Sequence, residues 1–147
     1  MQPRKSERPA PNAKPSLIVV DASAIVDRLL GTAVRGAAVE EEMRRARLLH
    51  TLDFAYLEIL STLRRKAGHG QLSDQRARQA VSDLATAPFA RHPAAPLAER
   101  IWELRESHTP YDAAYLALAE ALSMPLLTTD RRLARSGGHR ARIIEAQ

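Results

Sequence analysis

The sequence feature that most constrains the fold is LIVV at residues 17–20, an apolar run that no polar residue interrupts. An uninterrupted run rich in β-branched residues is typical of a strand buried on both faces, as in a parallel sheet. Asp21 ends the run, and the next segment, SAIVDRLL, has helical spacing up to Gly31, which suits a helix end. Residues 17–31 therefore predict a strand, an aspartate and a helix in succession.

The remaining chain repeats this alternation of strands and helices. Apolar runs predict further strands near 49–52, 88–93, 126–130 and 141–145. Helical spacing predicts helices over 37–49, 53–68, 73–87, 95–107 and 110–122, with a short helix or turn after residue 130 and with Asp53, Ser73 and Thr109 as N-caps. This order predicts an α/β fold whose central, mainly parallel sheet is covered by helices on both faces.

Length and composition indicate one folded domain and exclude several classes of protein. The chain has 147 residues and no cysteine, which excludes disulfides, thiolate zinc sites and cysteine nucleophiles. No apolar stretch approaches the roughly 18 residues of a membrane span, so we expect a cytoplasmic protein with no membrane contact. Residues 1–15 are basic and proline-rich, and we expect a disordered extension ahead of a domain at 16–147.

Four carboxylates lie on mostly apolar elements, unlike the acidic residues of polar surface runs. Asp21 and Asp130 each follow an apolar strand, at the sheet edge where α/β proteins bind ligands. Asp112 lies in the first turn of a helix and Glu58 inside another, FAYLEIL. Each also has a structural interpretation, because an aspartate can cap a helix or complement its N-terminus and Glu58 could pair with Arg64 or Arg65.

Taken together, the four carboxylates predict a cation site. Four anions at one sheet edge would repel one another and lose hydration, which raises their pKa values. A divalent cation removes this cost, and hard oxygen ligands favour Mg²⁺ or Mn²⁺ over zinc. One or two such ions could activate a water for in-line attack on a phosphodiester.

Four segments together resemble the PIN-domain ribonuclease toxins of the VapC type: VVDASAIVDRLLG, LEILSTLRR, YDAAYLALAEAL and PLLTTDRRLA. The similarity runs from about residue 17 to residue 145. It implies a three-layer α/β/α fold and an endoribonuclease that depends on Mg²⁺ or Mn²⁺. It also implies an RNA substrate, a cognate antitoxin protein, and homodimers or toxin–antitoxin hetero-oligomers.

The resemblance also implies roles for individual residues. The acidic catalytic set would be Asp21, Glu58, Asp112 and Asp130, of which the three aspartates would bind the metal. The hydroxyls of Thr128 and Ser23 would support this set. Three arginines that follow Asp130 are candidates for RNA phosphate contacts, with ordinary surface charge as the alternative: Arg131, Arg132 and Arg135.

Two other functions remain open on the sequence. A phosphatase or phosphotransfer receiver also places an aspartate at a strand end, but DAS lacks the DxD pattern, and a receiver's strand-end lysine is missing because the chain's lysines are Lys5, Lys14 and Lys66. A catalytically inactive PIN-like module that binds RNA or a protein would share the fold without cleaving RNA.

Overall fold

The computed structural model describes residues 17–147 and contains one five-stranded sheet. The strands are β1 (Leu17–Val20), β2 (Leu48–Leu52), β3 (Phe89–His92), β4 (Leu126–Thr128) and β5 (Ile143–Glu145). Their order across the sheet is β3-β2-β1-β4-β5, and every pairing among them is parallel. The predicted sheet was mainly parallel, and the sheet of the described chain is parallel throughout.

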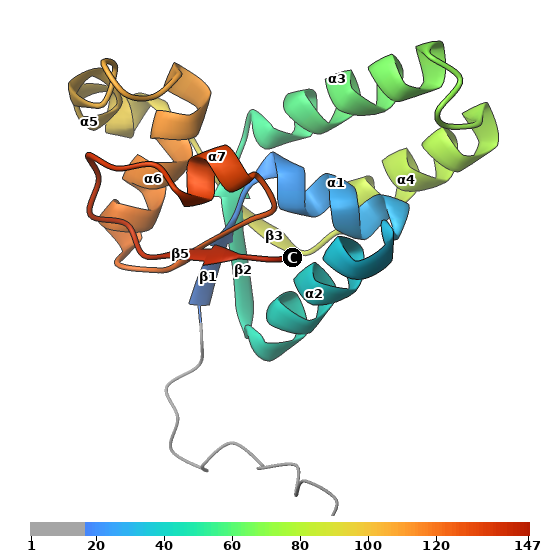
Figure 1. The fold of residues 1–147 in the computed structure, drawn as a ribbon, viewed down its shortest axis with the longest axis horizontal. Coiled ribbons are helices and arrows are strands. Elements are labelled where there is room, and N and C mark those ends of the chain that lie inside the picture. Colours follow the sequence, from blue (N-terminus) through green and yellow to red (C-terminus); the bar gives the residue numbers. More distant parts are fainter. Residues whose placement is uncertain (1–16) are drawn as a thin grey trace, which may run out of the picture.

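Helices cover both faces of the sheet, which gives the three layers of the predicted fold (Figure 1). One face carries α1 (Ala22–Leu30), α2 (Ala33–Arg45), α3 (Ala55–Gly68) and α4 (Asp74–Thr86). The other face carries η1 (Ala95–Leu97), α5 (Ala98–Glu103), α6 (Pro110–Leu122) and α7 (Arg131–Ala134). No helix within residues 17–147 is long and apolar enough to cross a bilayer.

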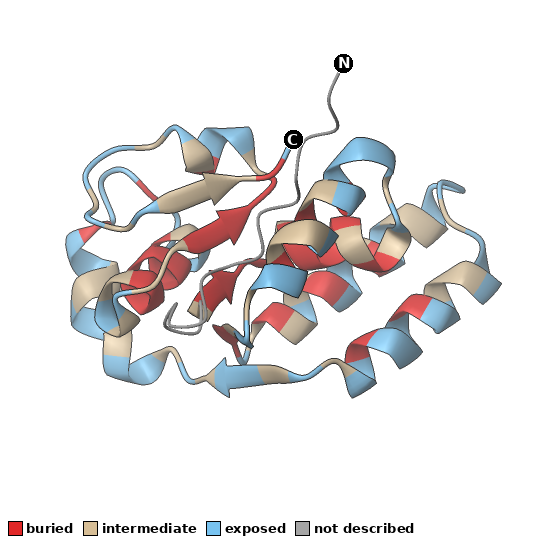
Figure 2. Ribbon diagram, turned by 90° about the horizontal axis from the view of Figure 1, so that it is seen from below, coloured by how far each residue is buried: buried red, intermediate tan, exposed pale blue. Residues whose placement is uncertain are grey.

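The apolar run of β1 supplies both hydrophobic cores. Ile18 and Val20 pack with α1 to α4, while Val19 packs on the opposite face with α6. All three side chains are buried, and Figure 2 shows buried residues both on the sheet and on the helices that pack against it. Side chains alternate between the faces of a strand, so a strand with a core on each side needs an apolar residue at every position.

The strand order places a topological switch point between β1 and β4. The chain leaves β1 toward β2 and β3 on one side, and β4 and β5 lie on the other. Ligands in open α/β sheets bind outside the carboxyl ends of the strands at this point. Asp21 and Asp130 follow the two strands that flank it.

Three helix predictions needed correction. The helix expected over 37–49 is α2, which begins at Ala33 and ends at Arg45, so the following strand starts at Leu48. Asp53 is not an N-cap, because α3 begins after Phe54 without a side-chain cap. The helix expected over 95–107 shortens to η1 and α5, which ends at Glu103.

Other local predictions are confirmed. Ser73 and Thr109 accept hydrogen bonds from the backbone amides of Arg76 and Asp112, as N-caps do. Gly31 ends α1 with a φ of 61°, a left-handed conformation that glycine adopts without strain. The extension expected at residues 1–15 lies outside the described residues.

Candidate active site

Asp21 lies at the centre of a hydrogen-bonded cluster between β1 and β4. Its Oδ1 accepts from the Ala24 amide (2.9 Å) and from Ser23 Oγ (2.7 Å), and its Oδ2 accepts from Thr128 Oγ1. Ser23 Oγ also accepts from the amide of Thr129 at 3.2 Å. The capping interpretation of Asp21 is therefore correct, and the same bonds fix the carboxylate at the carboxyl end of β1.

Burial makes the ionised form of Asp21 costly. The residue is only 4% exposed, and loss of hydration raises its pKa from 3.8 to about 6. Hydrogen bonds from Thr128, the Ala24 amide and Ser23 oppose this rise, and the nearby charge of Asp130 adds to it. A cation beside Asp21 would stabilise the carboxylate form.

Glu58 reaches the same region from α3 and is oriented by a tyrosine of α6. Tyr115 is buried, and its Oη donates a hydrogen bond to Glu58 Oε1 at 2.8 Å. Partial burial raises the pKa of Glu58, the bond from Tyr115 lowers it, and the charge of Asp112 raises it further. Tyr115 thus holds a half-buried carboxylate in place across two helices.

Asp112 and Asp130 are joined by one guanidinium group. Arg132 Nη2 lies 3.1 Å from Asp112 Oδ2 and 3.7 Å from Asp130 Oδ2. Asp130 also caps α7, because its Oδ1 accepts from the amides of Arg132 (2.8 Å) and Leu133 (3.3 Å). Oδ1 of Asp130 therefore has a structural role at the start of α7. Its Oδ2 lies near the Arg132 guanidinium, which also contacts Asp112.

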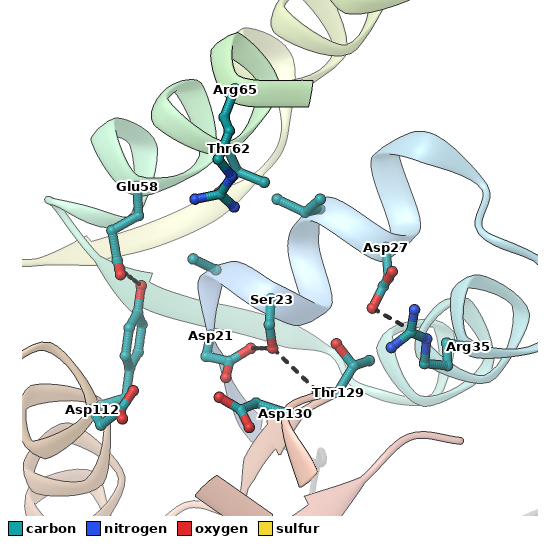
Figure 3. Close-up of a pocket in the computed structure, with 13 residues that line it drawn as sticks. Asp21, Ser23, Asp27, Arg35, Glu58, Thr62, Arg65, Asp112, Thr129 and Asp130 are labelled. Atoms are coloured by element: carbon teal, nitrogen blue, oxygen red, sulfur yellow. Dashed lines mark hydrogen bonds and ion pairs between the residues drawn. The ribbon is translucent and has the colours of Figure 1, made fainter. Parts of the chain in front are cut away.

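One cleft gathers all four predicted carboxylates (Figure 3). Its volume is about 400 Å³, and we call it the acidic cleft. Five carboxylates and two guanidinium groups line it, together with hydroxyls and small side chains: Asp21, Ala22, Ser23, Val26, Asp27, Arg35, Glu58, Thr62, Arg65, Asp112, Tyr115, Thr129 and Asp130. The excess of anionic groups gives the cleft a negative potential that attracts cations and repels a polyanion when no cation is bound.

The sequence motif of a known family extends over most of this fold. The sequence pattern described as the PIN domain matches residues 18–138. The chain belongs to the PIN-domain family. Ribonuclease VapC12 of Mycobacterium tuberculosis is 39% identical over 127 residues, covering 86% of this chain and 97% of that protein. Ribonuclease VapC9 of the same organism is 40% identical over 121 residues, covering 82% and 91%.

Solved structures agree with this PIN-domain assignment at the level of the fold. The crystal structure of PAE2754 from Pyrobaculum aerophilum matches with a TM-score of 0.66 and 24% identity, covering 87% of this chain and 89% of that one. A toxin–antitoxin complex from Klebsiella pneumoniae matches with a TM-score of 0.61 and 18% identity, covering 88% and 98%. The resemblance to VapC-type proteins is confirmed by the relatives and the α/β/α fold by these structures.

The donor set of this PIN domain suits a hard divalent cation, since it offers carboxylate and hydroxyl oxygens. Within residues 17–147, however, no group of three or more histidine, aspartate or glutamate side chains is arranged to hold a metal ion. Asp21, Glu58 and Asp112 each accept a hydrogen bond from a side chain of the protein. The metal-binding role of the aspartates stays a prediction.

Sequence reasoning did not assign several residues of the cleft to the site. Thr62 and Arg65 lie one and two turns beyond Glu58 on α3, and all three line the cleft. Spacings of four and seven residues place side chains on one helix face, so this signal was available. Asp27 and Arg35, 3.9 Å apart, come from α1 and α2, and no local pattern marks them.

The three arginines after Asp130 have separate environments. Arg131 lies 3.7 Å from Glu145 and is exposed, and Arg135 is exposed beyond the end of α7. Arg132 is the one of the three that contacts cleft carboxylates. Their contact with RNA phosphates stays a prediction.

Proposed function

We propose that this protein is a metal-dependent endoribonuclease and the toxin of a type II toxin–antitoxin pair. The observation that carries the proposal is the acidic cleft, where four carboxylates far apart in the sequence lie at the switch point of a PIN-domain sheet. The relatives that this chain matches over nearly their whole length are named ribonucleases. Domain 16–147 would carry the whole activity.

Asp21, Asp112 and Asp130 would hold Mg²⁺ or Mn²⁺, and Glu58 would complete the acidic set. When bound, the cation neutralises these carboxylates, activates the attacking water and stabilises charge on the scissile phosphate. Because Arg132 contacts Asp112 and Asp130 in this structure, its guanidinium must move away from these carboxylates when Mg²⁺ or Mn²⁺ binds them.

The chain's own residues prepare the cleft for an RNA strand. Thr128 and Ser23 donate to Asp21 and fix both carboxylate oxygens before substrate arrives. Tyr115 fixes Glu58 Oε1 in the same way. Arg65 supplies a cation on the α3 wall that can pair with a phosphate oxygen. Water attack at phosphorus with cleavage of the P–O3′ bond would give a 5′-phosphate and a protonated 3′-hydroxyl end.

The proposed partner is a cognate antitoxin protein. Two solved structures with the same fold are toxin–antitoxin complexes, one from Klebsiella pneumoniae and one from Rickettsia felis bound to promoter DNA. A protein that covers the acidic cleft would exclude RNA from it. We propose a homodimer or a toxin–antitoxin hetero-oligomer as the assembly in the cell.

The direct test is cleavage of single-stranded RNA by the purified protein. We expect cleavage with Mg²⁺ or Mn²⁺, none with EDTA, and at least a hundredfold loss in Asp21→Asn and Asp112→Asn. The matched control is Asp83→Asn, an exposed carboxylate on α4, which should cleave as the wild type does. Undiminished cleavage by both cleft variants would remove the assignment.

The cellular role has its own test. Induction should arrest growth, Asp21→Asn should abolish the arrest, and the product of the adjacent small gene should relieve it. Arrest that persists in Asp21→Asn would separate toxicity from the acidic cleft.

The competing function is an inactive PIN-like module that binds RNA or a protein. The contact of Arg132 with Asp112 and Asp130 is the observation that suits it, while the intact set of four carboxylates argues against it. Calorimetric titration with Mn²⁺ in the absence of RNA distinguishes the two. Saturable binding that Asp112→Asn weakens supports the nuclease, and RNA binding without Mn²⁺ binding or cleavage supports the inactive module.

A further inference from the structure

A second cavity adjoins the acidic cleft and shares Asp112 with it. Its volume is about 470 Å³, and we call it the adjoining pocket. Residues 105–110, before and at the start of α6, form one wall, and Arg132, Leu133 and Ser136 form the other. The two cavities meet at Asp112, and Arg132 of the adjoining pocket contacts both Asp112 and Asp130.

A buried histidine in this pocket lacks the partners that its burial requires. His108 is 8% exposed, and neither ring nitrogen makes a hydrogen bond of good geometry, although the Leu104 carbonyl lies near the ring. The neighbouring ring of His139 stands edge-on at 5.9 Å and offers no bond. Buried polar groups in folded proteins are nearly always paired. Both ring nitrogens of His108 are buried, so a small turn of the ring is needed before one of them donates to a ligand in the cavity.

The chemistry of the pocket wall selects an anionic ligand. Arg105 and Arg132 line it, and so do the hydroxyls of Ser107 and Thr109, while Ser136 Oγ already donates to the Leu133 carbonyl. The positive end of the 13-residue helix α6 also opens here. A neutral imidazole has one N–H, which can donate to an anion's oxygen.

The guanidinium of Arg105 stacks on an aromatic ring. Its guanidinium carbon lies 4.7 Å from the ring centroid of Trp102, which is the single tryptophan of the chain and is 68% exposed. Such stacking orients the guanidinium without using all of its N–H donors. The tryptophan therefore also gives a fluorescence signal next to the pocket.

The carboxylates of the pocket do not cancel these cations. Glu106 lies 3.3 Å from Arg105, but its side chain is 81% exposed, and such a surface pair is weak. Asp112 is contacted by Arg132 through Nη2 alone, so the planar fork retains other donors.

We propose that the adjoining pocket binds a backbone phosphate of the RNA strand that flanks the scissile bond, with Arg105 and Arg132 as cations and His108 as an N–H donor. This inference rests on the proposed function, because it assumes that a strand crosses the acidic cleft. A strand bound at Asp112 must continue past it, and the adjoining pocket shares that wall. Phosphate contacts position a strand without reading its sequence.

The test compares Arg105→Ala and His108→Gln with Arg78→Ala. Arg78 is an exposed arginine of α4, so Arg78→Ala removes the same charge at a position outside the adjoining pocket. In Mg²⁺, binding of a short mixed-sequence RNA with cleavage-resistant phosphorothioate linkages should change the emission of Trp102 and the anisotropy of that emission. Arg105→Ala should weaken binding roughly three- to tenfold and reduce the slope of log affinity against log salt by about 1, with Arg78→Ala unchanged. Circular dichroism checks that each variant is folded.

Cleavage kinetics give a second readout. Arg105→Ala should raise KM by a similar factor and leave kcat near the wild-type value, because the contact is made equally before and during the reaction. If the wild type cleaves RNA but Arg105→Ala and His108→Gln match Arg78→Ala in affinity and KM, the pocket proposal is overturned and the nuclease proposal stands. If only antitoxin binding is weakened, the pocket belongs to a protein partner and the proposal is equally overturned.

If the wild type fails to cleave RNA, the nuclease proposal falls while the emission change still reports on the pocket. Saturable RNA binding that Arg105→Ala weakens would then support a phosphate site in an inactive module. Absence of RNA binding by the wild type would overturn both proposals.

Discussion

Replacing Asp21 by asparagine should make the metal-free protein more stable at neutral and alkaline pH while it abolishes cleavage. Burial raises the pKa of Asp21 from 3.8 to about 6. At about 1.4 kcal/mol per pKa unit, ionising this carboxyl in the folded protein costs about 3 kcal/mol. Asparagine is neutral at every pH and avoids this cost.

The sign of the pH dependence follows from the direction of the shift. The folded state holds the Asp21 proton more tightly than the unfolded chain, so wild-type stability falls as pH rises from 3.8 through about 6. Above this window the whole cost is present, and below it the cost vanishes. Asparagine also loses part of the bonding to Ser23 and Thr128, a penalty of about 1 kcal/mol that does not depend on pH.

Urea unfolding in EDTA, followed by circular dichroism, measures the effect. The stability of Asp21→Asn, measured as its free energy of unfolding minus that of the wild type, should be larger by about 2 kcal/mol at pH 8 than at pH 4.5. The control is Glu99→Gln, which removes an exposed carboxylate on α5, outside the acidic cleft. Added Mg²⁺ should stabilise the wild type and not Asp21→Asn.

Equal differences at the two pH values would refute the reasoning, because they would show that Asp21 carries no burial cost. Stabilisation of Asp21→Asn by Mg²⁺ equal to that of the wild type would refute the link between this cost and a cation.

Three further changes have defined outcomes. Tyr115→Phe removes the bond to Glu58 and should raise the pKa of that carboxyl, which moves the acidic limb of the pH–activity profile upward and lowers kcat while the fold is kept. Gly36→Ala places a Cβ 2.8 Å from the Asp27 carbonyl oxygen, so α2 must shift from α1, and chemical denaturation should show a loss of about 1–3 kcal/mol. Glu120→Gln breaks the bonds from Arg100, which hold the pKa of Glu120 at about 2. It should cost roughly 2 kcal/mol at pH 7, a difference that shrinks as pH falls from 4.5 to 2.

Much of the fold was predictable because its signals are local. The β1 run, the caps at Ser73 and Thr109 and the end at Gly31 each depend on a few adjacent residues. The failed cap at Asp53 shows the limit, since the start of α3 is set where the chain leaves β2 and packs. Tertiary packing of this kind overrides the weak preference of an aspartate for the N-cap position.

For the site, strand ends and family motifs predicted the four carboxylates, because parallel strands bring their carboxyl ends to one edge. They could not predict which donor holds each group. The bond from Tyr115 to Glu58 and the contact of Arg132 with Asp112 depend on how separate elements pack. His108 had no signal at all, since its lack of partners is a property of the folded interior.

The wide separation of the acidic residues along the chain affects when the cleft can exist during synthesis. Asp21 is made before its partner Thr128, at the end of β4, and before the capping residue Asp130. A ribosome that stalls, or a protease that cuts, before residue 126 leaves a chain without β4, in which no hydroxyl donates to Asp21 Oδ2. Such fragments also lack Asp130, so the acidic cleft is complete only once synthesis has passed residue 130.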